Sequence, residues 1–69
     1  MTFKPGQAVW RGGPHIPWVP ATITDVQPKF VVYRLDTGEF GVGYYDLPTP
    51  YLRPRDPALN GADKPKEQP

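Results

Sequence analysis

Eleven prolines are distributed over the 69 residues of this chain, and they constrain its fold more than any other feature. Each proline removes a backbone donor and disfavours a helical conformation in the residue before it, so long helices are excluded. The intervals between prolines are short runs rich in β-branched and aromatic residues, which are typical of strands. The sequence therefore predicts an all-β domain of short strands joined by tight turns.

Five strands are expected, followed by a short tail. They are residues 7–11, 18–26, 29–35, 39–45 and 51–53, with a single 3₁₀-type turn over residues 47–50 before the last strand. Asp36-Thr37-Gly38 separates the third strand from the fourth, and a three-residue loop with glycine in its last place is typical of a β-hairpin. This order of strands and turns predicts a small five-stranded SH3-like barrel.

The alternation of residue types predicts which side chains fill the core. In the second strand, Val19, Ala21 and Ile23 share one face, which we expect to be buried. Gly41 and Gly43 lie within the fourth strand, where glycine marks a bend or the close approach of another group. Both features are consistent with a tightly coiled sheet.

The chain is expected to form one domain, residues 1–57, followed by a disordered tail, residues 58–69. Leu59 is the only large apolar residue of the tail, so the tail has little surface to bury against its ordering entropy. Phe3 and Trp10 are interpreted as packing residues. Arg53 and Arg55 are interpreted as part of a solvated surface, because acidic residues such as Asp56 interrupt the basic ones.

Composition excludes several kinds of site. Cysteine is absent and His15 is the single histidine, so neither a disulfide framework nor a Cys/His metal cluster is expected, and no cofactor is predicted. The formal net charge of +1 does not indicate a strong nucleic-acid footprint. No signal peptide or apolar span is recognised, which predicts a soluble, cytoplasmic protein.

Residues 6–23 resemble the opening of PWWP and Tudor domains. Pro17-Trp18-Val19-Pro20-Ala21-Thr22-Ile23 is similar to the Pro-x-Trp-Pro-Ala-x-Ile motif of PWWP domains, except at Val19. The segment FVVYRLDTGE, residues 30–39, is similar to a Tudor strand and turn, and Leu52-Arg53-Pro54 resembles the closing strand of those barrels. The resemblance covers about residues 5–54, and it implies an SH3-like barrel that acts as a binding module.

The same resemblance implies where an aromatic cage for methylated side chains would lie. The cage positions of these families fall on Ile16, Val19, Arg34 and Thr37. Three of these residues have no π system, and a guanidinium would repel a methylated lysine. We therefore do not expect this chain to bind methylated lysine in the manner of its relatives.

A different surface is predicted around Trp18, Arg34 and Tyr45. These residues lie opposite the core if Val19, Phe30, Val32 and Tyr44 point inward. An exposed Trp and Tyr beside an Arg have the composition of a protein-binding hot spot, and they would also suit stacking on unpaired bases. The expected function is a non-catalytic module that binds a protein partner, with nucleic acid as the alternative partner.

Catalytic motifs are few, and no enzyme activity is expected. Asp36-Thr37-Gly38 is the active-site triplet of dimeric aspartic proteases, but here it is interpreted as the hairpin turn. Val42-Gly43-Tyr44-Tyr45 is similar at its first and last positions to the pore-lining Val-Gln-Ile-Tyr strand of the tetrameric type II dihydrofolate reductases. Gly43 stands where that family has its ligand-binding Gln, so this reductase remains a distant alternative.

Overall fold

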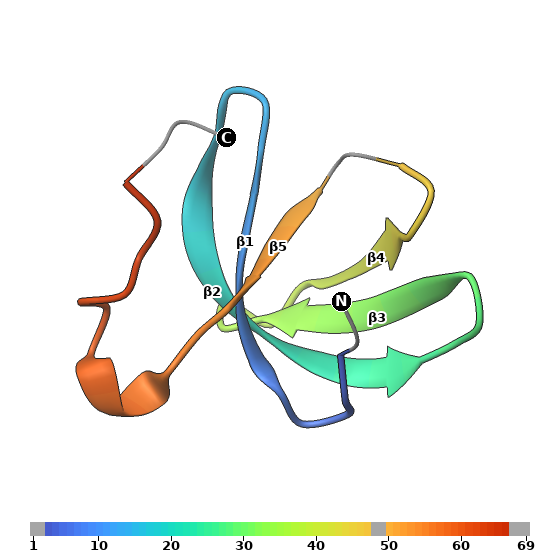
Figure 1. Cartoon of the computed structure of the whole chain (residues 1–69), viewed down its shortest axis with the longest axis horizontal. Coiled ribbons are helices and arrows are strands. Elements are labelled where there is room, and N and C mark those ends of the chain that lie inside the picture. The colour runs from blue at the N-terminus through green and yellow to red at the C-terminus, as the bar shows by residue number, and fades with distance from the viewer. Residues whose placement is uncertain (1–2, 48–49, 67–69) are drawn as a thin grey trace.

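The computed structural model describes residues 3–47 and 50–66, and within them the fold is all-β (Figure 1). Each strand overlaps its predicted run. The elements are β1 (Ala8–Gly13), β2 (Ile16–Val26), β3 (Phe30–Leu35), β4 (Phe40–Tyr44), β5 (Tyr51–Pro54) and a 3₁₀ turn η1 (Pro57–Leu59). The 3₁₀-type turn predicted over 47–50 includes residues 48 and 49, which lie outside the described residues.

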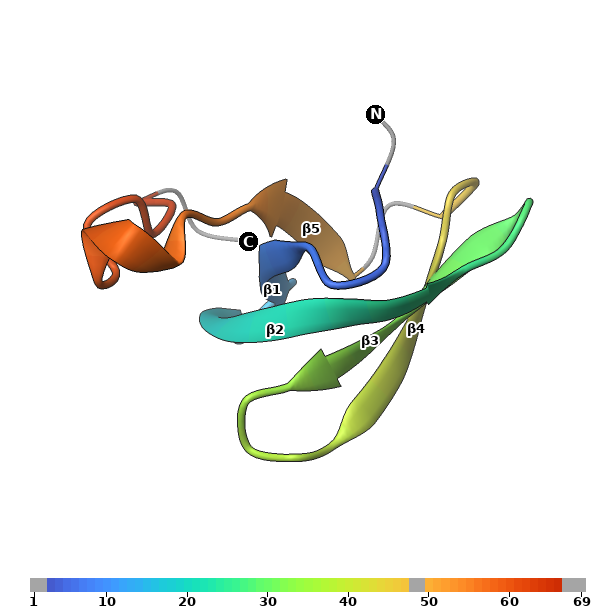
Figure 2. The same cartoon turned by 90° about the horizontal axis from the view of Figure 1, so that it is seen from below.

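The five strands form one antiparallel sheet in the order β4-β3-β2-β1-β5. β1 and β5 lie on one side of the long strand β2, and β3 and β4 lie on the other (Figures 1 and 2). No pairing joins β4 to β5 in the described part of the chain, so the sheet is strongly coiled but not closed. The expected barrel is thus an open one, with a seam between its two edge strands.

Two irregularities in the pairing help to coil the sheet. The register shifts between Arg11 and Gly13 where β1 pairs with β2, and between Ile23 and Asp25 where β2 pairs with β3. A bulge of this kind bends the strand and increases its right-handed twist. β2 therefore contributes to both halves of the sheet although it remains one strand of 11 residues.

The core lies inside the coiled sheet and confirms the predicted face of β2. Ala21 and Ile23 are buried, and Val19 packs partly buried against them. Phe3 and Trp10 are also buried, as predicted. The central cluster consists of Phe3, Val9, Ala21, Ile23, Val31, Tyr33 and Leu35.

The predicted inward face of β3 is wrong by one residue. Val31, Tyr33 and Leu35 are buried, whereas Phe30 and Val32 are only partly buried. Apolar residues occupy both faces of this strand, so alternation alone does not define its core side. The register with β4 defines the core side, because Tyr33 pairs with Gly41 and Val31 pairs with Gly43.

The glycines of β4 make room for these side chains, which confirms the predicted close approach. A Cβ placed on Gly41 would lie 2.5 Å from the Tyr33 ring, and one on Gly43 would lie 3.1 Å from Leu52 Cδ1. The hairpin turn is also confirmed, because Gly38 has a φ of 104° and its amide donates to Leu35 O at 2.8 Å. Only glycine adopts such a φ without strain.

Part of the predicted disordered tail, residues 58–66, has a defined backbone path with its own hydrogen bonds. Asp56 caps η1 by accepting a hydrogen bond from the Ala58 amide at 3.0 Å, and Asn60 ends the turn with a φ of 50°. Asp63 then accepts bonds from the Trp10 indole at 3.3 Å and from the Asp56 amide at 2.7 Å. Polar contacts therefore hold this segment where apolar burial cannot, and residues 67–69 lie outside the described chain.

Arg55 joins this segment to the sheet, which corrects its interpretation as a solvated residue. Its guanidinium donates to Val9 O at 3.1 Å and to Ala21 O at 2.9 Å, and it lies 4.0 Å from Asp36 Oδ1. It also stacks over the Trp10 ring at 5.8 Å. Trp10 is thus buried on the outside of the sheet, beneath Arg55 and the C-terminal segment.

Candidate binding surface

The structure does not bring the three predicted site residues together. Trp18 is 5% exposed, so the expectation that it faces solvent is wrong. Its ring packs against Tyr51 at 6.2 Å and beneath the Arg53 guanidinium at 5.9 Å. Sequence reasoning missed this cover because it depends on the pairing of β5 with β1, which brings Tyr51 close to Trp18.

Arg34 and Tyr45 are exposed, but they lie at opposite ends of the β3–β4 ladder. Arg34 pairs with Phe40 beside the hairpin turn. Tyr45 follows the far end of β4, where its amide donates to Lys29 O at 3.0 Å. These two residues therefore belong to one hairpin without forming one site.

The outer face of this hairpin forms a different surface. Of the three predicted site residues, it includes Arg34 alone. Three cross-strand pairs, which share a face because paired residues point to the same side of a sheet, form this surface. We call it the outer hairpin face, and it consists of Phe30, Val32, Arg34, Phe40, Val42 and Tyr44.

Aromatic side chains at both ends of the outer hairpin face are well exposed. Phe40 is 68% exposed and Tyr44 is 49% exposed, although Tyr44 was expected to point inward. The Arg34 guanidinium lies over the Phe40 ring at 5.9 Å, and Phe30 contacts Tyr44 with ring centroids 5.6 Å apart. Each end of the face thus presents a pair of side chains already in contact, a cation over a ring at one end and two tilted rings at the other.

β4 is an edge strand whose solvent-facing side is apolar, whereas an edge strand usually directs polar residues to solvent. Its exposed side carries Phe40, Val42 and Tyr44, and its core side carries Gly41 and Gly43. Contiguous exposed apolar groups mark interaction sites more often than scattered ones do. This reversal is the signal in the sequence that could have located the face, because the glycines identify the crowded side of the strand.

A shallow groove adjoins the Phe30–Tyr44 end of the face. It has a volume of about 470 Å³ and is lined by Pro28, Lys29, Phe30, Tyr44, Tyr45 and Asp46. Its walls are mainly apolar, and one basic and one acidic residue lie at its rim. Tyr45 is therefore placed at the edge of the outer hairpin face, beside a groove that could hold a side chain.

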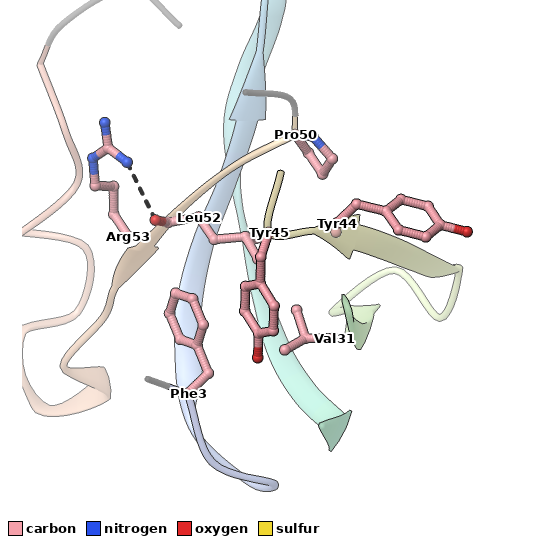
Figure 3. A pocket seen from close by; sticks show the side chains of 8 residues that line it. Phe3, Val31, Tyr44, Tyr45, Pro50, Leu52 and Arg53 are labelled. Atoms are coloured by element: carbon pink, nitrogen blue, oxygen red, sulfur yellow. Dashed lines mark hydrogen bonds between the residues drawn. The ribbon is translucent and has the colours of Figure 1, made fainter. Parts of the chain in front are cut away.

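A second hollow of about 250 Å³ lies at the seam between β4 and β5. Figure 3 shows Phe3, Tyr45, Leu52 and Val31 converging on it, while Tyr44 points away toward the outer hairpin face. Arg53 also points away, and its guanidinium donates to Leu52 O at 3.3 Å (Figure 3). Side chains from the N-terminal segment and β5 thus line the seam that backbone pairing leaves open.

The described residues offer few groups for acid–base or metal chemistry. Burial raises the pKa of Tyr33 above its usual value of 10.0, and the nearby charge of Arg11 offsets part of that rise. No group of His, Asp or Glu side chains among residues 3–47 and 50–66 is arranged to hold a metal ion. None of the helical segments described there is long and apolar enough to span a membrane.

Comparisons with models of protein families, with curated proteins and with solved structures found no match to this chain. The PWWP and Tudor resemblance therefore rests on the sequence motifs and on the five-stranded antiparallel sheet alone.

Proposed function

We propose that this chain is a non-catalytic module that binds a protein partner through the outer hairpin face. The observation that carries the proposal is the reversed polarity of β4, which directs Phe40, Val42 and Tyr44 toward solvent on an edge strand. Aromatic residues and arginine dominate the energetics of protein interfaces. The face has these residue types at its two ends and valines at its centre.

The charges around the face favour a protein over a nucleic acid as the partner. Arg34 is the only cation of the face itself, and Lys29 at the groove is accompanied by Asp46. Asp36 and Glu39 lie close to the Arg34 end, at the hairpin turn. A phosphate backbone needs a concentrated basic track, which this arrangement does not supply.

We further propose that the module is of the SH3-like kind found in Tudor and PWWP domains, with a ligand surface different from theirs. The strand order and the matching motifs support the kinship. The cage positions support the difference, because Ile16 lies at the β1–β2 turn and Arg34 on the outer hairpin face. Methylated and unmodified lysine peptides should therefore bind equally.

Site-specific photo-crosslinking in the native cell would test the proposed surface. A photoreactive phenylalanine in place of Phe40 should capture a defined protein partner. The same group in place of Ile16, which is 42% exposed at the β1–β2 turn, should not capture that partner. The purified partner would then be bound to wild type and to Val42→Lys.

The proposal predicts at least about a tenfold loss of affinity for Val42→Lys, because a charge would enter the centre of an apolar contact. The affinity of wild type should change little between low and moderate salt. Equal crosslinking from positions 16 and 40 would contradict the proposed surface. A steep fall with salt, together with capture of nucleic acid, would instead support the alternative partner.

A further inference from the structure

Arg11 has a position on β1 that the packing of the sheet does not explain. It lies on β1 two residues after Val9, which is fully buried, so alternation places both on the core side of the strand. Its backbone partners on the neighbouring strands are Val19 and Leu52, which both pack against the core. Arg11 is thus a partly buried cation on the core side of β1.

The guanidinium of Arg11 has no hydrogen-bonding or ion-pair partner among residues 3–47 and 50–66. Its Nε atom is fully buried and makes no hydrogen bond within the described part of the chain. No ion pair joins Arg11 to a carboxylate there either. Buried charged groups are normally paired, so an unpaired buried donor calls for a partner such as a water molecule or a bound ligand.

A hollow of about 420 Å³ lies beside Arg11. It opens at the β3–β4 turn, and its lining consists of Arg11, Val19, Pro20, Leu35, Asp36, Thr37 and Glu39. Val19, Pro20 and Leu35 form apolar walls, whereas Asp36, Thr37 and Glu39 are exposed. Two of the residues at the expected cage positions, Val19 and Thr37, thus line a pocket that contains a cation.

We propose that this hollow binds a carboxylate carried on an apolar group. The guanidinium fork matches the two oxygens of a carboxylate, and the apolar walls match the body of such a ligand. Asp36 and Glu39 at the rim disfavour a phosphate dianion more strongly than they disfavour a monoanion. The ligand preference is therefore opposite in charge to that of a methyl-lysine cage.

This inference does not depend on the proposed function. The hollow is lined from the core side by Arg11 and Leu35, whereas the outer hairpin face lies on the other side of β3. The carboxylate could come from a small acid or from the C-terminus of a peptide that ends in an apolar residue. Both sources share the same recognition chemistry, and the choice of probes distinguishes them.

Titrations followed by ¹H–¹⁵N NMR would test the inference on the full-length chain. The probes are 4-methylpentanoate, its neutral amide, inorganic phosphate, and N-acetyl-Ala-Leu with either a free or an amidated C-terminus. The free acids should bind with a Kd of about 1 mM, as expected for ligands of this size, and should shift the Nε–H resonance of Arg11. The amides and phosphate should bind at least about tenfold more weakly.

The two free acids also identify the source of the carboxylate. Tighter binding of the dipeptide would support a peptide C-terminus, and tighter binding of 4-methylpentanoate would support a small acid. If neither acid moved the Arg11 Nε–H resonance at about ten times the expected Kd, the inference would be overturned. Equal binding of an acid and its amide would also overturn it.

Variants give a second, independent readout. Arg11→Met keeps the aliphatic length without the charge, so acid binding should fall at least about tenfold while the thermal midpoint stays equal or rises. Arg11→Lys should retain part of the affinity, because the charge remains but the fork is lost. Lys4→Met, which removes an exposed cation elsewhere, should change neither quantity. A lower midpoint for Arg11→Met with unchanged acid binding would show that Arg11 is structural and would contradict the proposal.

Discussion

Gly41 is the position on β4 where a side chain has the least room. A Cβ there would lie 2.5 Å from the ring of Tyr33, so a side chain at residue 41 must displace a buried aromatic group. We expect Gly41→Ala to lower the free energy of unfolding by about 1–3 kcal/mol, which is the usual cost of overpacking. Urea denaturation of the variant beside Thr37→Ala, an exposed control in the hairpin turn, would measure the effect.

A double-mutant cycle would identify the cause. If Tyr33 is the obstacle, then Gly41→Ala should cost less in a Tyr33→Leu background than in wild type. Equal costs in the two backgrounds would mean that the strain comes from the backbone of β4 itself.

The faces of β3 are tested by a pair of neighbouring valines. Val31 is fully buried, whereas Val32 is partly exposed on the outer hairpin face. Val31→Ala should therefore cost about 2–3 kcal/mol of unfolding free energy, and Val32→Ala should cost less than about 1 kcal/mol. Thermal and urea denaturation of the two variants would check this order, and the reverse order would place the core on the other face of the strand.

The segment after β5 is expected to stabilise the sheet through Asp63. Its pKa is lowered, chiefly by the hydrogen bond from the Asp56 amide, with a smaller contribution from the Trp10 indole. A carboxyl with a depressed folded-state pKa stabilises the fold above its ordinary value of 3.8, and this contribution is lost as the pH falls through the lower folded value. Asp63→Asn should thus lower stability at neutral pH and reduce the loss of stability on acidification below about pH 4.

Truncation tests the contribution of the whole segment to stability rather than that of the Asp63 carboxylate alone. Deletion of residues 57–69 should lower the thermal midpoint by several degrees, because Trp10 loses its indole acceptor and part of its cover. An unchanged midpoint in the truncated chain, together with unaltered tryptophan fluorescence, would show that the segment contributes nothing.

At the scale of whole elements, the predictable features are those set by local residue patterns. The prolines, the Asp36-Thr37-Gly38 turn and the alternation in 18–26 together define the five strands and the buried side of β2. The faces of β3 depended on cross-strand register, since only the pairing with Gly41 and Gly43 decides which apolar residues can enter the core. That information is not local to either strand.

At the scale of the whole molecule, the unpredicted features join residues that are distant in the sequence. Trp18 is covered by Tyr51, which was not predicted. Trp10 was predicted to pack, but its cover by Arg55 and Asp63 was not. Arg34 and Tyr45 are exposed, as predicted. Their role in binding stays a prediction.

The central claim is that the outer hairpin face binds a protein, and the affinity of the purified partner for three matched variants tests it most directly. Phe40→Ser and Tyr44→Ser remove exposed aromatic groups from the two ends of the face, and Ile16→Ser removes a comparably exposed apolar group elsewhere. Isothermal titration calorimetry at about 0.15 M salt should show at least about a tenfold loss for each of the first two variants and less than about a twofold change for the third. Wild-type affinity in both Phe40→Ser and Tyr44→Ser would contradict the account.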